Sequence, residues 1–380
     1  MDDSQSGRPL SAIVLAAGHG TRMRSERPKP LHVLVGKPMV VWVLDALADC
    51  SVGRVSVVVG HGADEVTKRL VEDAGDRPLE FVEQTVQRGT GDAAAVGLTG
   101  LVDDEYAEPQ DVLVLTADTP LLRTETIASL VEHHRSTDSA CTVLTADMDD
   151  PTGYGRIVRG RDDRVERIVE QADATDDEAS ITEINTGIFC FRRGLLAPAL
   201  RRIQPDNAQG EYYLTDIVEV LADTGHRVTS MVADDPDETH GINDRVQLAS
   251  AEAELRRRIN LEWMRQGVTL VDPTRTHLDA TVVLERDVTL YPGTMLQGAC
   301  RIGAGADIGP DSHLVDTVVG EGAHVVQTAA MKATIGNGAT VGPWGALGPG
   351  DEVAAGVTTG PHYAGANTAP PEPASPEPAS

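Results

Sequence analysis

Two cations and a run of small residues near the start of the chain could hold phosphate groups. Residues 16–21 read Ala-Ala-Gly-His-Gly-Thr, and such small residues let backbone N–H groups approach a ligand closely. Arg22 and Lys29 place two positive charges beside this loop. The apolar run 12–15 before it is suited to a buried strand. A strand that enters a glycine loop beside cations is a recurrent phosphate site in α/β proteins.

Two better-known glycine loops are excluded by single residues. A P-loop requires Gly-Lys-Ser/Thr, whereas Gly20 is followed here by Thr21 and Arg22. A dinucleotide fingerprint requires a third glycine, and Met23 occupies that position. The alternative is a small-residue turn that only packs against its neighbours, and the two cations argue against it.

A second candidate site lies at residues 84–93, which read QTVQRGTGDA. The amide of Gln84 offers a donor and an acceptor, which match the edge of uracil. The backbone groups of Gly89 and Thr90 can complete that pattern. The alternative is a loop that caps a helix beginning near Asp92.

A third candidate is Asp118, which follows the clearest buried strand of the chain, Asp111–Thr116. A carboxylate at the end of such a strand costs desolvation free energy unless a cation offsets it. Mg²⁺ is the natural cation, because it takes carboxylate oxygens and bridges substrate phosphates. The alternative is an aspartate that begins a turn before Pro120.

The elements that must position these residues alternate between strand and helix. Strands are predicted at 54–59, 79–82 and 111–116, and helices at 38–49 and from Gly62 to Glu72. This rhythm predicts an α/β fold with a Rossmann-like, doubly wound parallel sheet, whose ligands bind at the carboxyl ends of the strands. A long charged helix is predicted over 246–266, leaving this domain.

The pattern changes from about Thr281 onward. Apolar residues recur mostly every six positions from Val282 to Val353, and glycines mark the turns. A hexapeptide repeat predicts a short left-handed parallel β-helix, here of roughly four coils. From Asn367 the chain is almost entirely Pro, Ala, Ser and Glu, which predicts a disordered tail.

Composition limits the class of partner and the compartment. The 380 residues carry 32 cationic and 59 anionic side chains, a net charge of −27, which argues against nucleic acid and anionic membranes as partners. The four cysteines are far apart and form no C-x-x-C pair, so we expect free thiols rather than a metal site. The polar N-terminus and the lack of a long apolar stretch predict a cytoplasmic protein without membrane insertion.

Several strings together identify a family. Residues 15–29 resemble the L-x-x-G-x-G-T-R-M…P-K signature of sugar-phosphate nucleotidyltransferases, and residues 84–93 resemble their Q-x-x-Q-x-G-T-x-x-A uridine site. Residues 150–157 match the D-P-T-G-Y-G-R-I segment of bacterial N-acetylglucosamine-1-phosphate uridylyltransferases. The strings EINTGI, EYYLTD and GINDR further along are similar too. By this resemblance the chain is identified as a member of the GlmU-type bifunctional enzymes.

The resemblance implies a reaction and roles for individual residues. UTP and N-acetylglucosamine 1-phosphate would give UDP-N-acetylglucosamine and pyrophosphate, which feeds peptidoglycan and cell-envelope synthesis. Arg22 would stabilise the leaving pyrophosphate and Lys29 the α-phosphoryl group. Asp118 and Asn243 would hold Mg²⁺, although Asn243 on its own would be taken for a helix cap. The implied substrate-binding residues are Leu15, Ala16, Ala17, Gly18, Gln84, Gly89, Thr90, Gly155, Glu170, Asn185 and Asn243.

The chain departs from the family pattern at a few positions. Ala117 stands where the family has Gly, and Ala172 where many members have Lys. Gly348 replaces an arginine of the family's acetyl-acceptor site, and His362 lies in a string unrelated to the one that carries the family's catalytic histidine. We therefore expect acetyl transfer to be absent.

The resemblance also implies a homotrimer assembled through the β-helix. The predicted division is a nucleotidyltransferase domain at 1–245, a helical arm at 246–273, a truncated β-helix at 274–360 and a tail at 361–380. Two alternatives stay open from sequence. One is a sugar nucleotidyltransferase of other specificity, for example for glucose 1-phosphate, and the other is a non-catalytic assembly subunit.

Overall fold

The computed structural model describes residues 8–48, 50–73, 75, 77–101, 110–160 and 162–368. The polar residues 1–7 and the end of the predicted tail, 369–380, lie outside these ranges. Within the described ranges, residues of 1–33 and 38–251 form one compact unit, and residues of 34–37 and 252–368 form a second. None of the helices described there has the length and apolar character needed to cross a bilayer.

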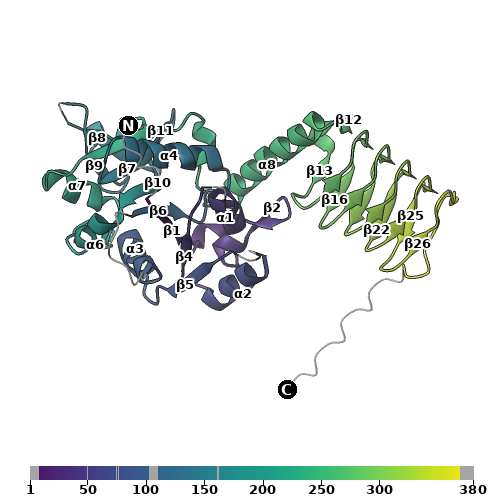
Figure 1. The fold of residues 1–380 in the computed structure, drawn as a ribbon, viewed down its shortest axis with the longest axis horizontal. Coiled ribbons are helices and arrows are strands. Elements are labelled where there is room, and N and C mark those ends of the chain that lie inside the picture. The colour runs from purple at the N-terminus through teal and green to yellow at the C-terminus, as the bar shows by residue number, and fades with distance from the viewer. Residues whose placement is uncertain are drawn as a thin grey trace, which may run out of the picture. The chain divides into compact units, whose positions relative to one another are not determined.

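The first unit is built on a sheet ordered β11-β7-β10-β6-β1-β4-β5 (Figure 1). Its strands are β1 (Leu10–Leu15), β4 (Arg54–Val59), β5 (Leu79–Glu83), β6 (Asp111–Thr116), β7 (Cys141–Asp147), β10 (Glu183–Arg192) and β11 (Val228–Val232), and β8 (Gly155–Arg159) and β9 (Val165–Val169) extend it as a hairpin. All pairs along the main order are parallel except those of β10, which is antiparallel to β6 and β7. The predicted parallel sheet is therefore mixed, because a hairpin and a one-turn helix, rather than a long helical crossover, lead from β7 to β10.

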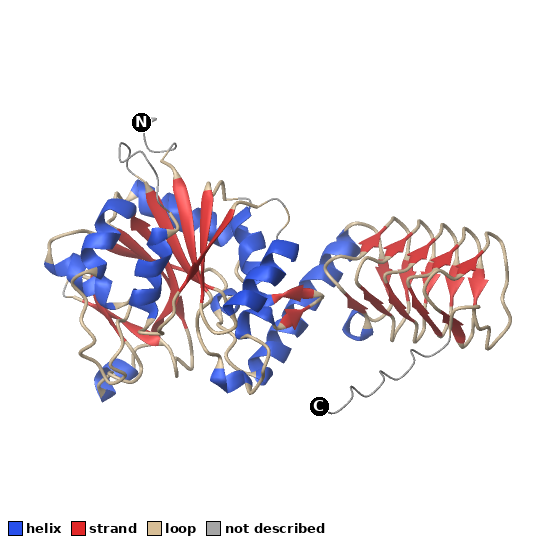
Figure 2. Ribbon diagram, turned by 90° about the horizontal axis from the view of Figure 1, so that it is seen from below, coloured by secondary structure: helices blue, strands red, loops and turns tan. Residues whose placement is uncertain are grey.

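Helices cover both faces of this sheet (Figure 2). One face packs against α1 (Met39–Ala48), α2 (Ala63–Asp73) and α4 (Thr124–Ser136), and the other against α3 (Thr90–Thr99), α6 (Arg193–Leu200) and α7 (Asp216–Asp223), while α5 (Asp176–Ala179) precedes β10. Side chains alternate between the two cores along β1: Ala12 and Val14 join the first, and Ile13 joins the second. The burial of both faces explains why the strands are continuous apolar runs.

The sheet register brings two loops together at the carboxyl ends of the central strands. Leu15, at the end of β1, lies opposite Thr116, at the end of β6. The backbone N–H of Ala117 donates to the Leu15 carbonyl at 3.0 Å, and that of Ala16 donates to the Val58 carbonyl at 2.8 Å. The small-residue loop and the loop that carries Asp118 therefore start side by side.

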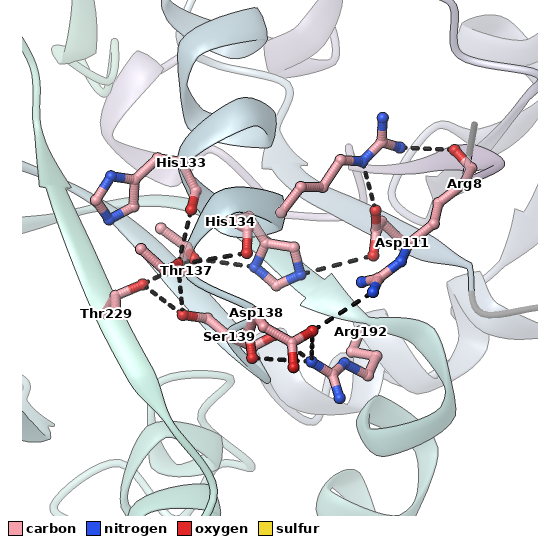
Figure 3. Close-up of polar contacts among 11 residues, drawn as sticks. Arg8, Asp111, His133, His134, Thr137, Asp138, Ser139, Arg192 and Thr229 are labelled. Carbon is pink, nitrogen blue, oxygen red and sulfur yellow. Dashed lines mark hydrogen bonds and ion pairs between the residues drawn. The ribbon is translucent and has the colours of Figure 1, made fainter. Parts of the chain in front are cut away.

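A buried ionic network fixes the opposite end of β6 (Figure 3). Asp111 is fully buried and accepts a bond from Arg135 Nε at 2.8 Å, while Nε2 of the buried His134 lies 3.7 Å from its other oxygen. Arg135 also donates to the Arg8 carbonyl at 2.7 Å, and His134 Nδ1 lies 2.9 Å from Thr142 Oγ1. These contacts join the end of α4 to β6 through Asp111, to β7 through Thr142, and to Arg8, which lies two residues before β1.

The second unit is the predicted β-helix. Its short strands form three parallel five-stranded sheets, ordered β12-β15-β18-β21-β24, β13-β16-β19-β22-β25 and β14-β17-β20-β23-β26. In chain order they are Thr269–Leu270, His277–Leu278, Val283–Leu284, Thr289–Leu290, Met295–Gln297, Arg301–Ile302, Asp307–Ile308, His313–Val315, Val318–Val319, His324–Val325, Thr328–Met331, Thr334–Ile335, Thr340–Val341, Gly345–Leu347 and Glu352–Val353. One strand from each sheet makes one coil of this left-handed β-helix, whose core is a column of aliphatic side chains.

The β-helix has five coils where about four were predicted. The first coil begins at Thr269 and contains the 3₁₀ helix η4 (Pro273–Arg275). Because this helix interrupts the six-residue period, the repeat pattern of the sequence does not reveal the first coil. The predicted tail is also partly wrong, because Ala364 bridges to Ala346 and Tyr363 packs against the core. The division at residues 245, 273 and 360 otherwise stays a prediction.

The remaining described elements are short, apart from one helix. The long predicted helix is α8 (Arg245–Arg265). The others are the paired strands β2 (Val33–Leu34) and β3 (Lys37–Pro38) and the 3₁₀ helices η1 (Thr21–Met23), η2 (Lys29–Leu31) and η3 (Pro236–Thr239). Helices η1 and η2 carry the two cations that follow the small-residue loop, and the turn after η3 leads to Asn243.

Candidate active site

A pocket of about 300 Å³ opens at the carboxyl ends of the central strands of the first unit. Nine of the predicted site residues line it: Leu15, Ala16, Ala17, Gly18, Lys29, Gln84, Gly89, Thr90 and Asp118. It therefore joins the small-residue loop after β1, the loop after β5 and the loop after β6. These three loops are the places where an open α/β sheet binds its ligand.

The two predicted cations meet the two predicted metal ligands. Lys29 Nζ lies 2.5 Å from Asp118 Oδ2 and 2.9 Å from Asn243 Oδ1. Arg22 Nη2 donates to the same Asn243 oxygen at 3.0 Å. Residues more than 200 positions apart in the chain thus converge on one point. The ammonium offsets the charge of the strand-end carboxylate, which is largely buried.

The segment that carries Asn243 is attached directly to the Asp118 loop. The backbone N–H of Ile242 donates to the Asp118 carbonyl at 2.8 Å. The backbone N–H of Asn243 donates to Gln247 Oε1 at 2.6 Å, and its side-chain Nδ2 lies 3.3 Å from the Gly241 carbonyl. These bonds hold the amide oxygen of Asn243 toward Asp118 and leave it free to accept from cations.

The donor set fits a hard divalent cation. Asp118 offers a carboxylate and Asn243 an amide oxygen, and both already contact one positive group, the Lys29 ammonium. Mg²⁺ is usually bound by one or two such oxygens together with substrate phosphates and water. Within the described ranges, no group of three or more His, Cys, Asp or Glu side chains is placed to hold a metal. A metal here would therefore depend on the substrate for its other ligands.

The loop after β5 is built tightly around Gln84. Its buried Nε2 donates to Asp92 Oδ2 at 2.8 Å and to the Gly89 carbonyl at 3.2 Å. Gly89 has φ +111°, and a Cβ there would lie 2.5 Å from the Tyr212 carbonyl oxygen. The donor of Gln84 is thus used within the loop, which differs from the expectation that the amide offers both a donor and an acceptor to a base.

Three more predicted residues converge beside the β8–β9 hairpin. Asn185 pairs with Gly155 across β10 and β8, and Glu170 follows β9. A Cβ on Gly155 would lie 3.4 Å from Glu170 Oε2 and 3.5 Å from Asn185 Cβ. The same Cβ would lie 3.0 Å from Ile168 Cγ2, so there is little room for a side chain on Gly155 beside the two polar residues. Glu170 Oε1 accepts a bond from Thr215 Oγ1 at 3.0 Å, and Asn185 Oδ1 accepts one from the Gly187 N–H at 3.0 Å.

Carboxylates near this hairpin raise one another's pKa. Burial raises the pKa of Glu170, and Asp173 raises it further, against the bond from Thr215. Burial and the charges of Glu170, Glu219 and Asp173 raise the pKa of Asp216 to about 6. Several carboxyl groups are therefore crowded together beside this hairpin, and each disfavours the ionised form of its neighbours.

The pocket also contains residues that were not predicted to be part of the site. These are His19, Pro30, Gln87, Ala93, Thr116, Ala117 and Glu211. The Gln87 amide donates to the Gln84 carbonyl at 3.3 Å, and the His19 ring lies 5.5 Å from that of His61. Gln87 occupies a fixed position of the Q-x-x-Q string and could have been found from it. Glu211 is the first residue of the EYYLTD string and could likewise have been found from it.

Comparison with known proteins gives the family. The MobA-like NTP transferase domain family matches residues 12–223, which belong to the first unit except for 34–37. The chain is 41% identical over 349 residues to the bifunctional protein GlmU of Shouchella clausii, which covers 92% of this chain and 75% of that protein. It is 46% identical over 345 residues to the bifunctional protein GlmU of Rhodococcus opacus, covering 90% and 68%. The GlmU of Cutibacterium acnes is 45% identical over 346 residues, covering 90% and 81%.

The similarity extends over both the nucleotidyltransferase unit and most of the β-helix. It agrees with the fold, with the pocket at the strand ends and with the position of the glycine loop. Identities above 40% over nine-tenths of the chain go well beyond a shared fold. The chain is therefore a nucleotidyltransferase that belongs to the GlmU family.

Proposed function

We propose that this chain transfers a uridylyl group from UTP to N-acetylglucosamine 1-phosphate, giving UDP-N-acetylglucosamine and pyrophosphate. The observation that carries the proposal is the convergence of Lys29, Arg22, Asp118 and Asn243 beside the strand-end pocket, which Lys29 and Asp118 line. Nucleotidyl transfer requires mainly positioning and charge neutralisation, and such a set of groups supplies both.

The loop after β5 would recognise the base. Gln84 Oε1 would accept the N3–H of uracil, because Gln84 Nε2 already bonds to Asp92 and Gly89. The backbone N–H groups near Gly89 and Thr90 would donate to the uracil carbonyls. Cytosine has no N3–H, so an acceptor at this position favours uracil over cytosine.

The β8–β9 hairpin would recognise the sugar. Glu170 and Asn185 meet over Gly155, and they offer a carboxylate and an amide to the sugar hydroxyls and the N-acetyl group. The match of residues 150–157 to the family segment favours the N-acetylated sugar over glucose.

The reaction follows from these placements. A phosphate oxygen of the sugar 1-phosphate attacks the α-phosphorus of UTP in line, a P–O bond forms, and the bond to pyrophosphate breaks. Arg22 and the backbone N–H groups of residues 15–18 stabilise the leaving pyrophosphate, and Lys29 neutralises the α-phosphoryl group. Asp118 and Asn243 would hold Mg²⁺, which when bound supplies charge neutralisation between the two substrates.

We further propose that the chain's own residues do not support acetyl transfer. Gly348 stands at the position of the family's acetyl-acceptor arginine, and a Cβ there would lie 2.0 Å from the Asn367 carbonyl oxygen. The backbone of Asn367 and Thr368 thus occupies the space that the side chain of an arginine would need.

Two related properties are part of the same proposal. The β-helix would assemble three copies of the chain, as the resemblance implies. The four cysteines are free thiols and the substrate is UTP, so we place the reaction in the reducing cytoplasm.

Pyrophosphate release by the purified protein tests the proposed specificity. With UTP and Mg²⁺, we expect release with N-acetylglucosamine 1-phosphate and little with glucosamine or glucose 1-phosphate. Arg22→Ala should lower the rate by about 10²–10³-fold, because it removes one preorganised donor to the leaving group. The exposed Arg27→Ala is the matched control and should keep the full rate. Release with glucose 1-phosphate alone would show that the sugar pocket has been misassigned.

A further inference from the structure

The ammonium of Lys29 occupies the position between the two proposed metal ligands. It contacts Asp118 Oδ2 at 2.5 Å and Asn243 Oδ1 at 2.9 Å. A divalent cation bound by the same two oxygens would lie at about 2.0–2.1 Å from each of them. Two positive groups cannot share that space, so one must leave when the other arrives.

The backbones of the two residues are held in place independently of Lys29. Asp118 is anchored through its carbonyl to Ile242, and Asn243 is anchored through its backbone N–H to Gln247. Arg22 donates to the same Asn243 oxygen at 3.0 Å, which keeps that oxygen polarised. Both side-chain oxygens therefore extend from anchored backbones to one cation position, and the ammonium is its occupant.

The stem of Lys29 is placed so that the ammonium can move. A Cβ on Gly20 would lie 2.6 Å from Lys29 Cβ and 3.3 Å from its Cγ and Cδ, so the aliphatic part of Lys29 lies against the small-residue loop. Beyond that contact the terminal carbon and the ammonium extend into the pocket, which Lys29 lines. A rotation of the outer bonds moves the charge from Asp118 toward the loop, and the stem stays in place.

We propose that Lys29 is a placeholder cation, which neutralises Asp118 in the free enzyme and is displaced toward the phosphates when the metal–nucleotide complex binds. This inference rests on the proposed function, because it takes the nucleotide triphosphate as the ligand that brings the metal. It assigns Lys29 two successive positions, one on Asp118 and one on the phosphoryl group.

The placeholder has a consequence for the order of binding. In the free enzyme the metal must compete with a tethered ammonium, so metal alone binds weakly. The nucleotide's phosphates offer the ammonium a second partner, and the metal then gains both oxygens. Metal and nucleotide therefore bind together, and Lys29 reaches the α-phosphoryl group only when the metal site is filled.

The test is the affinity of the nucleotide-free protein for Mn²⁺, followed by electron paramagnetic resonance. Lys29→Met keeps the length of the side chain and removes the charge. It is expected to bind Mn²⁺ about tenfold or more tightly than the wild type, because one charged hydrogen-bonded competitor has been removed. Lys68→Met, on the exposed face of α2, is the matched control and should bind Mn²⁺ like the wild type. Asp118→Asn should lose the binding in either background.

Equal or weaker Mn²⁺ binding by Lys29→Met would overturn the proposal. If Lys29→Met does not fold, as judged by circular dichroism, Lys29→Gln takes its place with the same expectation. The outcome is independent of the proposed function, since no turnover is measured. A wild type without uridylyl transfer would refute the proposed function, whereas an active wild type whose Lys29 variants bind Mn²⁺ no more tightly would refute only the placeholder.

Discussion

Asp216 carries the most strongly perturbed carboxyl beside the proposed sugar pocket. It is the first residue of α7, and burial together with the charges of Glu170, Glu219 and Asp173 raises its pKa to about 6. A raised pKa means that the folded protein binds this proton more tightly than the unfolded chain does. Ionisation of Asp216 at neutral pH therefore lowers the free energy of unfolding.

Asp216→Asn should stabilise the protein at pH 7.5. Between the unfolded pKa near 3.8 and the folded value of about 6, stability falls as pH rises, and the loss is complete above that window. After allowance for solvent screening, the gain in unfolding free energy should be about 1 kcal/mol. Urea denaturation at pH 7.5 and pH 4.5 measures it, and the difference should be smaller at pH 4.5, which lies near the lower end of that window.

Asp223→Asn, at the exposed end of the same helix, is the control for this prediction. It should not reproduce the gain at pH 7.5. A variant Asp216→Asn that is less stable than the wild type at pH 7.5 would mean that the carboxylate makes a favourable contact in the folded protein.

Individual site residues differ in how well the sequence predicts them. Asp118 follows a long apolar strand, and such a position predicts a polar site from local pattern alone. The contact of Lys29 and Asn243 could not be predicted from pattern, because it depends on two loops 214 positions apart. The internal use of the Gln84 donor was missed because it depends on how the loop after β5 turns to bring Asp92 and the Gly89 carbonyl to the amide.

Among the elements, β6 and α4 are tied together by charge as well as by packing. Asp111 is the first residue of β6, and its carboxylate is fully buried. His134 and Arg135, at the end of α4, both contact this carboxylate (Figure 3). Burial by itself would raise the pKa of Asp111, but the two cationic or donor side chains bring it below its ordinary value. Asp111 therefore contributes stability at neutral pH that is lost as pH falls through its folded pKa.

Arg135→Met should lower the free energy of unfolding by about 3 kcal/mol, because it leaves a buried carboxylate without its closest cation. It also removes the bond to the Arg8 carbonyl. The matched control is Arg164→Met, whose ion pair with Asp162 is exposed and should be worth about 0.5 kcal/mol or less. Urea denaturation at pH 7 compares the two, and equal losses would contradict the assignment of Asp111 as a stabilising charge.

The elements that were predicted best are those with a strong local pattern. Strands β4 and β6 have the predicted bounds, because each is a continuous apolar run buried on both faces. The direction of β10 could not be predicted, since it depends on the hairpin β8–β9 rather than on the residues of β10. The first β-helix coil was missed because η4 breaks the repeat that reveals the others.

At the scale of the whole molecule, the chain combines two units with separate cores. The first has two apolar clusters on either side of its sheet, and the second has a single aliphatic column. The proposed uridylyl-transfer residues all belong to the first unit, while Gly348 belongs to the second. We therefore propose one chemical activity for a chain whose relatives bear the name of bifunctional proteins.

Product analysis in the presence of acetyl-CoA tests whether the chain transfers uridylyl groups and no acetyl groups. The purified protein is incubated with UTP, Mg²⁺ and acetyl-CoA, together with either N-acetylglucosamine 1-phosphate or glucosamine 1-phosphate, and the products are followed by ³¹P NMR. We expect the diphosphate resonances of UDP-N-acetylglucosamine, together with pyrophosphate, in the reaction with N-acetylglucosamine 1-phosphate. We expect no UDP-N-acetylglucosamine in the reaction with glucosamine 1-phosphate. UDP-N-acetylglucosamine from glucosamine 1-phosphate would show that the chain also transfers acetyl groups. No nucleotide sugar in either reaction would contradict the proposed uridylyl transfer itself.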